Sequence, residues 1–246
     1  MLSNLKSELK PLITVIPESK YRAKTDSVSP HSARTSFEQL DSCFLGISLE
    51  NKNFTPEKLR ALAKWISRRF SYCVVLVGDS IHRLNLEITR SLEPKSALQE
   101  ALKDGRSFIE ENEHIFHNFG GQTKFTFETC SQIQESQEYT NFHRYLQSFF
   151  DSNADFRASV EDFGRKYHTR RRTDISDFLL EQRIHKSAEY FLEEFAIFAC
   201  LQRRGFSVMV YPGSFSTLTE VVNGKYPDLF EEIKQLIIVS VHFKTR

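Results

Sequence analysis

The sequence lacks the features that mark several large classes of protein. Its 246 residues include only four cysteines and nine glycines, and they contain no CxxC, HExxH, GxGxxG, GxxxxGK[ST] or GxSxG motif. Zinc sites, dinucleotide and phosphate loops and the nucleophile elbow of hydrolases are therefore unsupported. No HIGH-like or KMSKS-like signature of an ATP-using synthetase occurs either. We predict that the protein binds no metal and needs no cofactor.

Long apolar runs and an excess of one charge are also missing. No run approaches the roughly 18 apolar residues of a membrane helix, and the N-terminus has no secretion-signal pattern. The 33 basic and 32 acidic residues balance to a net charge of +1, which excludes a polycationic nucleic-acid coat and leaves room for a local basic patch. Cys43 and Cys73 lie in apolar runs, as buried reduced thiols do. We therefore expect a cytoplasmic protein without a membrane partner.

Apolar spacing predicts strands and helices in alternation. The predicted strands are 43–49, 72–77, 124–129, 206–211 and 236–243, and the predicted helices are 56–70, 80–91, 95–118, 133–150 and 174–204. This order is typical of an α/β fold, a Rossmann-like, mostly parallel sheet flanked by helices. We predict one domain over 1–246, with 1–40 as a loosely packed N-terminal segment. Ligands of such folds bind beyond the carboxyl ends of the strands, so Gly46-Ile47-Ser48 and Val210-Tyr211-Pro212 are the segments of interest.

Three segments, taken in order, resemble the cyclodipeptide synthases, which make cyclic dipeptides from two aminoacyl-tRNAs. The segment from Phe44 to Phe54 resembles the family's glycine–x–serine strand end, followed three residues later by asparagine. Tyr190 to Glu194 is similar to its Tyr-x-x-x-Glu helix, and Val208 to Pro212 is similar to its strand-end tyrosine. The similarity spans about 44 to 212. It implies a fold like the catalytic domain of class I aminoacyl-tRNA synthetases, without their ATP site.

The resemblance implies a ping-pong reaction. Ser48 would accept the first aminoacyl group as an ester, and reaction with the second aminoacyl-tRNA would give a dipeptidyl enzyme that cyclises without ATP. Tyr190 and Glu194 would hold the α-amino group, with Glu194 aiding proton transfer, and Tyr211 would orient groups beside the serine. The residues themselves fit these roles. Tyr190 and Glu194 are four residues apart on one helix face, and apolar neighbours would desolvate Glu194 and raise its pKa.

The resemblance also implies substrate-binding positions. Those near the aminoacyl group are Gly46, Asn51, Phe44, Val75, Cys130, Ile197 and Met209. Most of them are apolar, which favours an apolar first residue. Those for tRNA are Lys95, Lys103, Arg106, Arg165, Arg170, Arg171 and Arg172. The family divides by marker residues, and here Asn51 matches one group while Tyr211-Pro212 matches the other. Arg170 and Arg171 fall near the second aminoacyl pocket and would select a polar or acidic partner.

Two other functions are compatible with parts of the sequence. A non-catalytic tRNA- or RNA-binding α/β module could use the basic patch at 165–172, since cationic side chains hold phosphates. A nucleotide- or cofactor-dependent transferase is opposed by the missing glycine-rich loop. The two amino acids that are joined stay open, as does the choice between a monomer and a homodimer.

Overall fold

A computed structural model describes residues 19–169 and 176–245. Its strands are β1 (Tyr21–Ser29), β2 (Ser42–Ile47), β3 (Tyr72–Val77), β4 (Lys124–Thr129), β5 (Val208–Tyr211) and β6 (Ile237–Thr245). They form one sheet in the order β1-β6-β5-β2-β3-β4. Neighbouring strands are parallel except for β1, which pairs with β6 in the antiparallel sense. The mostly parallel α/β fold is confirmed.

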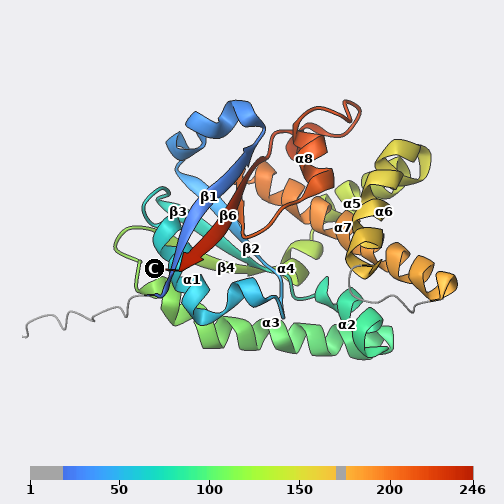
Figure 1. The fold of residues 1–246 in the computed structure, drawn as a ribbon, viewed down its shortest axis with the longest axis horizontal. Helices are drawn as coiled ribbons and strands as arrows, with labels where there is room; N and C mark the ends of the chain where they lie inside the picture. The colour runs from blue at the N-terminus through green and yellow to red at the C-terminus, as the bar shows by residue number, and fades with distance from the viewer. Residues whose placement is uncertain (1–18, 170–175, 246) are drawn as a thin grey trace, which may run out of the picture.

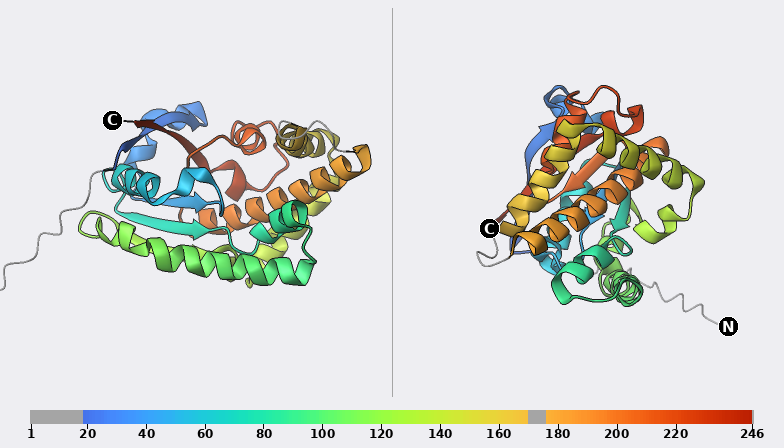
Figure 2. Two further views of the ribbon diagram at one scale, coloured as in Figure 1. Left: turned by 60° about the horizontal axis from the view of Figure 1, so that its bottom comes forward. Right: turned by 90° about the vertical axis from the view of Figure 1, so that its right-hand side faces the viewer.

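Helices cover both faces of this twisted sheet (Figures 1 and 2). They are α1 (Pro56–Ile66), α2 (His82–Arg90), α3 (Pro94–His117), α4 (Cys130–Gln134), α5 (Gln137–Ser152), α6 (Ala154–Thr169), α7 (Asp177–Arg203), α8 (Ser216–Val222) and α9 (Glu231–Lys234). Three 3-10 helices, His31–Thr35, Phe37–Gln39 and Lys52–Phe54, complete the described elements. In Figure 1, α3 runs along the bottom of the view, and α5, α6 and α7 lie together on the right.

The alternation of side chains along the strands produces two cores. Phe44, Val74 and Met209 pack with the apolar residues of α4, α5 and α7 on one face of the sheet. Leu45 and Val75, their neighbours in the chain, pack with α1 and the end of α3 on the other face. Successive residues of a strand point to opposite faces, so the strands β2, β3, β5 and β6 contribute to both cores, whereas the apolar residues of β1 and β4 belong to the second core.

The long helix α7 positions half of the site described below. Every residue from Phe191 to Leu201 is buried, and all of them except Glu193 and Glu194 are apolar, as is typical of a helix in a protein core. The Ser176 side chain caps its start by accepting a hydrogen bond from the amide of Leu179 at 3.4 Å. Gly205, with φ of 93°, follows its end in the left-handed conformation that glycine adopts without strain. The end of the predicted helix 174–204 is therefore confirmed to within one residue.

The N-terminal segment differs from the prediction. Residues 21–40 are not loosely packed, because β1 pairs with β6 along almost its whole length and two 3-10 helices follow. The apolar signal was weak, since only Ala23 and Val28 of β1 are buried and a bulge between Thr25 and Ser27 interrupts the alternation. The partner strand lies some two hundred residues away in the chain, where local patterns give no information.

Smaller differences concern the helices. The predicted helix 133–150 is two helices, because Ser136 leaves the helical path and caps α5 by accepting a hydrogen bond from the amide of Tyr139 at 3.1 Å. Helix α6 was not predicted at all. The strands 72–77 and 124–129 were predicted with their observed bounds.

Candidate active site

A cavity of about 850 Å³ lies beyond the carboxyl ends of β2 and β5. The loop after β2, one side of α2, the middle of α7 and the segment after β5 surround it. Ser48, Asn51, Tyr190, Glu194 and Tyr211 all line this cavity, although the chain separates the first two from the last three by more than a hundred residues. The structure thus brings together the four predicted catalytic residues at the edge where α/β folds bind ligands.

Ser48 directly follows Ile47, the last residue of β2, in the chain, and Tyr211 is the last residue of β5. Their hydroxyl oxygens are 3.0 Å apart, within hydrogen-bond distance, and either can be the donor. The parallel pairing of β2 with β5 produces this contact, because it aligns the carboxyl ends of two strands that are distant in the chain. The ring of Tyr211 rests against Gly213, where an added Cβ would come within 2.9 Å of it. At Gly46 an added Cβ would only make an ordinary contact with that ring, at 3.6 Å.

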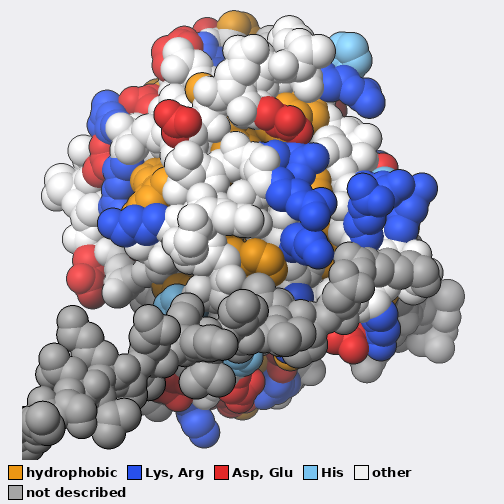
Figure 3. All heavy atoms as spheres, turned by 90° about the vertical axis from the view of Figure 1, so that its left-hand side faces the viewer, with side chains coloured by type: hydrophobic (Ala, Val, Ile, Leu, Met, Phe, Trp, Pro, Cys, Tyr) orange, Lys and Arg blue, Asp and Glu red, His pale blue; other side chains and the backbone are white. Residues whose placement is uncertain are grey.

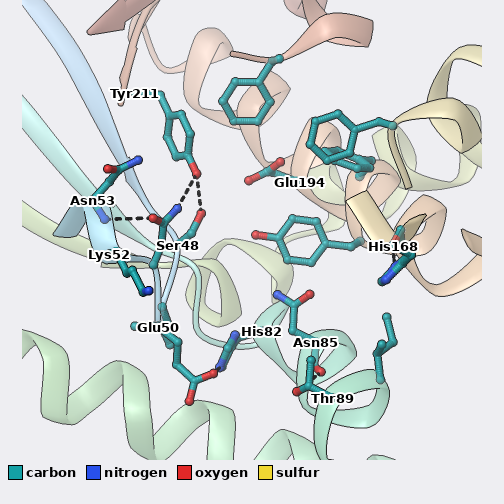
Figure 4. Close-up of a pocket in the computed structure, with 18 of the residues that line it drawn as sticks. Ser48, Glu50, Lys52, Asn53, His82, Asn85, Thr89, His168, Glu194 and Tyr211 are labelled. Carbon is teal, nitrogen blue, oxygen red and sulfur yellow. Dashed lines mark hydrogen bonds and ion pairs between the residues drawn. The ribbon is translucent and has the colours of Figure 1, made fainter. Parts of the chain in front are cut away.

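Asn51 holds Tyr211 from the other side. Its amide nitrogen donates to the Tyr211 hydroxyl at 3.3 Å, while its carbonyl oxygen accepts from the backbone amide of Asn53 at 3.0 Å. The Asn53 side chain then donates to the carbonyl of Pro212 at 2.9 Å. These contacts, part of which Figure 4 shows, join the loop after β2 to the segment after β5. The residues that match two different groups of the family therefore form a single hydrogen-bonded unit here.

Glu194 is a buried acid whose carboxylate faces the same space as Ser48 and Tyr211 (Figure 4). Burial raises its pKa to about 8, and a hydrogen bond with Tyr190 opposes the rise. Its Oε2 has no hydrogen-bond partner among the described residues. Burial also raises the pKa of Tyr190 well above its usual value, so this phenol stays protonated. The predicted rise in the pKa of Glu194 is confirmed.

The predicted aminoacyl pocket does not coincide with this cavity. Phe44, Cys130, Ile197 and Met209 are fully or almost fully buried in the core on the cavity's side of the sheet, and none of them lines the cavity. Val75 packs in the opposite core. Its assignment to this pocket was wrong, because alternation along β3 turns Val75 away from the face that carries the site.

The predicted tRNA-binding residues lie on separate elements. Lys95, Lys103 and Arg106 are exposed on α3, and the last two lie 8 and 11 residues after the first, so all three share one helix face. Arg165 on α6 forms an ion pair with Glu181 at 3.1 Å. Arg170, Arg171 and Arg172 lie outside the described residues. Figure 3 shows that Lys and Arg side chains also gather on the face at the left of Figure 1, so positive charge is not confined to α3 and α6.

The sequence analysis missed residues on α2. His82 and Asn85 line the cavity, and Arg83 pairs with the buried Glu193 through two hydrogen bonds, one of them at 2.8 Å. Gln134 also donates to Glu193, at 3.0 Å. The strand-end rule that drew attention to Ser48 applies equally to the residues that follow β3, and would have found His82.

The described part of the chain holds neither a metal cluster nor a membrane helix. No group of three or more His, Cys, Asp or Glu side chains there is arranged to hold a metal ion. No helix among those residues is both long and apolar enough to cross a bilayer. All four cysteines are buried and free, as predicted for Cys43 and Cys73.

Comparison with known proteins decides the family. A sequence model named cyclodipeptide synthase matches residues 26–226, most of the chain. The chain belongs to the cyclodipeptide synthase family. Members of this family are enzymes that transfer aminoacyl groups from tRNA. A search of curated proteins found no match.

Solved structures of the same family share the fold. A cyclodipeptide synthase from Fluoribacter dumoffii is 22% identical with a TM-score of 0.75, over 92% of this chain and 99% of that one. A Mycobacterium tuberculosis protein, described as demonstrating that cyclodipeptide synthetases are related to type I tRNA synthetases, is 16% identical with a TM-score of 0.68, over 94% and 96%. The enzyme from Candidatus Glomeribacter gigasporarum, described as bound to Phe-tRNAPhe, is 15% identical with a TM-score of 0.65, over 89% and 94%. The predicted likeness to class I synthetases is confirmed.

Proposed function

We propose that this enzyme joins two aminoacyl-tRNAs into a cyclic dipeptide through an aminoacyl ester on Ser48, without ATP. The observation that carries the proposal is the hydrogen bond of 3.0 Å between the hydroxyls of Ser48 and Tyr211, in the cavity that also holds the buried Glu194. The family membership and the similar structure described as bound to Phe-tRNAPhe support aminoacyl-tRNA as the substrate.

Ser48 acts as the nucleophile of the first step. Its oxygen attacks the carbonyl carbon of the aminoacyl ester, the bond from that carbon to the tRNA oxygen breaks, and the serine proton passes to the departing hydroxyl. One ester replaces another, so the exchange is close to isoenergetic and needs no ATP. Tyr211, which Asn51 holds in place, hydrogen-bonds Ser48 and is positioned to pass this proton.

The raised pKa of Glu194 suits proton exchange with an α-amino group. A peptide α-amino group has a pKa of roughly 7.7–8.0, and burial places Glu194 at about 8. Burial thus brings the Glu194 carboxyl into the pH range in which α-amino groups titrate. Glu194 can hold the ammonium ion when the first aminoacyl group binds and later accept its proton, which releases the amine as a nucleophile. The protonated Tyr190 contributes a second hydrogen-bonding group one helical turn away.

The released amine completes the reaction. The α-amino group of the Ser48 ester attacks the ester carbonyl of the second aminoacyl-tRNA, so a peptide bond forms, the tRNA leaves, and a dipeptidyl ester stays on Ser48. The new terminal amine then attacks the Ser48 ester carbonyl, which closes the six-membered ring and frees the serine. Because both groups are held in one cavity, each attack is effectively intramolecular.

The exposed cations of α3, Lys95, Lys103 and Arg106, are the described residues that best fit the tRNA backbone, because they share a helix face and form no ion pair with another described residue. Reversing all three charges should raise KM for aminoacyl-tRNA and reduce the slope of log KM against log salt by about 2–3 units, close to 0.9 for each lost phosphate contact. Reversal of Arg165 is the comparison, because that residue is paired with Glu181. An unchanged salt slope after reversal on α3 would place the tRNA on another face.

Mass spectrometry tests the function as a whole. Bacteria that express the wild type should release a cyclic dipeptide that is absent with Ser48→Ala, and Ser214→Ala is the matched control because Ser214 lines the same cavity. Purified wild type given one aminoacyl-tRNA should gain the mass of one aminoacyl group on the peptide that contains Ser48. A product made by Ser48→Ala would refute the ester mechanism. Binding of tRNA without any product from the wild type would favour the non-catalytic module.

A further inference from the structure

The cavity has two ends of different chemistry. Toward α6, α7 and the start of α8 it is lined by the aromatic rings of Phe163, Phe191 and Phe215, together with the hydrogen-bonded pair of His168 and Ser187. Toward the loop after β2 and α2 it is lined mainly by polar side chains, among them Glu50, His82, Asn85 and Thr89, and Figure 4 shows these four below Ser48, with Tyr211 and Glu194 above it. A cavity of about 850 Å³ is larger than an aminoacyl group needs, so the polar end is available for another part of the substrate.

His82 gives the polar end an unsatisfied hydrogen-bonding group. The residue is only 3% exposed, and its Nε2 has no hydrogen-bond partner among the described residues. The nearest carboxylate oxygen, Oε2 of Glu50, is 3.8 Å from that nitrogen, beyond hydrogen-bond length. Burial lowers the pKa of His82, so the imidazole is neutral at pH 7. A buried polar atom without a partner is costly, and a bound ligand would supply the partner.

The surroundings of His82 are held in place. Glu50 forms an ion pair with Arg90 of α2, and Arg90 also pairs with Glu100 of α3. The backbone of Glu50 is in the left-handed region at φ of 59°, which a residue with a side chain adopts only when its surroundings enforce it. The loop after Ser48 is therefore tied to α2 and to α3, the helix that carries the exposed cation Lys95.

The geometry points to a subsite for the ribose of the terminal adenosine of aminoacyl-tRNA at this polar end, with His82 Nε2 hydrogen-bonded to the ribose 2′-hydroxyl. This inference rests on the proposed function. The ester carbon must lie at Ser48 and the α-amino group at Glu194 on α7, so the ester oxygen and its ribose extend away from α7, toward α2. Aromatic rings on the α6 side suit amino-acid side chains, whereas a neutral imidazole, an amide and a hydroxyl suit a sugar. A 2′-hydroxyl both donates and accepts, so it fits either tautomer of His82.

Acceptor-stem minihelices aminoacylated at the 3′ position, ending either in adenosine or in 2′-deoxyadenosine, test this contact. With the wild type, the deoxy substrate should lose about fivefold to tenfold in kcat/KM, the value of one neutral hydrogen bond. His82→Gln, whose amide reaches the place of Nε2, should keep most of that loss. His82→Asn, whose amide is too short to reach it, should process the two substrates at nearly equal rates.

The matched control is His143→Asn. Its Nε2 is also buried without a partner among the described residues, but it lies on α5 and does not line the cavity, so the full loss with the deoxy substrate should remain. Thermal unfolding of each variant checks that the substitution leaves the fold intact. Equal rates for the two substrates with wild-type enzyme would overturn the inference, and so would an undiminished loss with His82→Asn. Failure of the proposed function looks different, since no minihelix would then yield a cyclic dipeptide with any variant.

Discussion

Burial of Glu194 makes the stability of the protein depend on pH in a direction opposite to that of most acids. Its pKa rises from 4.5 to about 8 in the folded protein because the carboxylate is desolvated. Between these two values the folded state holds a proton that the unfolded state has released. The contribution of Glu194 to the free energy of unfolding is therefore fully present below pH 4.5. It declines as the pH rises above 4.5 and is lost as the pH rises through 8. Glu194→Gln removes this dependence, because an amide does not ionise.

The size of the effect follows from the two pKa values. A difference of one between the folded and unfolded pKa corresponds to about 1.4 kcal/mol. Relative to pH values well below 4.5, the titration of Glu194 should lower the free energy of unfolding by about 1 kcal/mol at pH 5 and by about 5 kcal/mol at pH 9. The advantage of Glu194→Gln over wild type should thus grow by about 4 kcal/mol across this range. The test depends on how the difference in unfolding free energy between Glu194→Gln and wild type changes with pH. Its value at a single pH is not informative, because the amide also changes the local hydrogen bonds, and this effect does not vary with pH.

Urea unfolding at half-unit steps from pH 5 to pH 9 measures this difference. Glu181→Gln is the control, because it removes an exposed carboxylate from the same helix at the cost of an ion pair with Arg165. Its difference from wild type should change by less than about 1 kcal/mol. A constant difference between Glu194→Gln and wild type would mean that the acid is solvated in the folded state, and the proton-transfer role proposed for it would lose its basis.

Two further substitutions test contacts around the cavity. Asn51→Ala should lower kcat about tenfold with little change in KM, because it removes one of the hydrogen bonds that position the Tyr211 hydroxyl beside Ser48; steady-state kinetics showing a change in KM alone would contradict this. Arg83→Met should lower the unfolding free energy by about 3–5 kcal/mol, because it leaves Glu193, 4% exposed, as an unpaired buried charge. Arg69→Met, which breaks an ion pair with an exposed acid, should cost no more than about 1 kcal/mol, and equal losses in the two variants on urea unfolding would refute the distinction.

Local sequence patterns predicted the strands of the sheet other than β1 and the approximate positions of their ends. The run Tyr72–Val77 is β-branched and bounded by polar residues, and the strand has these bounds in the structure. Ser48 and Tyr211 were both placed at carboxyl ends of parallel strands, which was enough to bring residues 163 positions apart to one edge of the sheet. The likeness to the family then supplied which of the side chains at that edge to consider.

Features that depend on distant partners escaped prediction. The strand β1 buries two apolar residues and exists because β6 pairs with it, so its own sequence carries little signal. Val75 was assigned to the wrong face because matching to a family position does not fix the register of alternation. The contact between Arg83 and Glu193 spans 110 residues and depends on how α2 and α7 pack, which no periodicity encodes.

The adjacent acids Glu193 and Glu194 show how α7 combines structure with chemistry. Successive residues of a helix point about 100° apart, so Glu193 faces Arg83 and Gln134 while Glu194 faces the cavity. The pair with Arg83 links α7 to α2 and, together with the apolar packing of α7 in the core, helps to orient Glu194. Arg83 follows His82 directly in the chain, so the same ion pair connects the proposed ribose subsite on α2 with the acid on α7 that we propose holds the α-amino group. This buried ion pair therefore contributes to the spacing of the two helices that line the cavity. A loosened pair should weaken catalysis even though neither of its members touches the substrate.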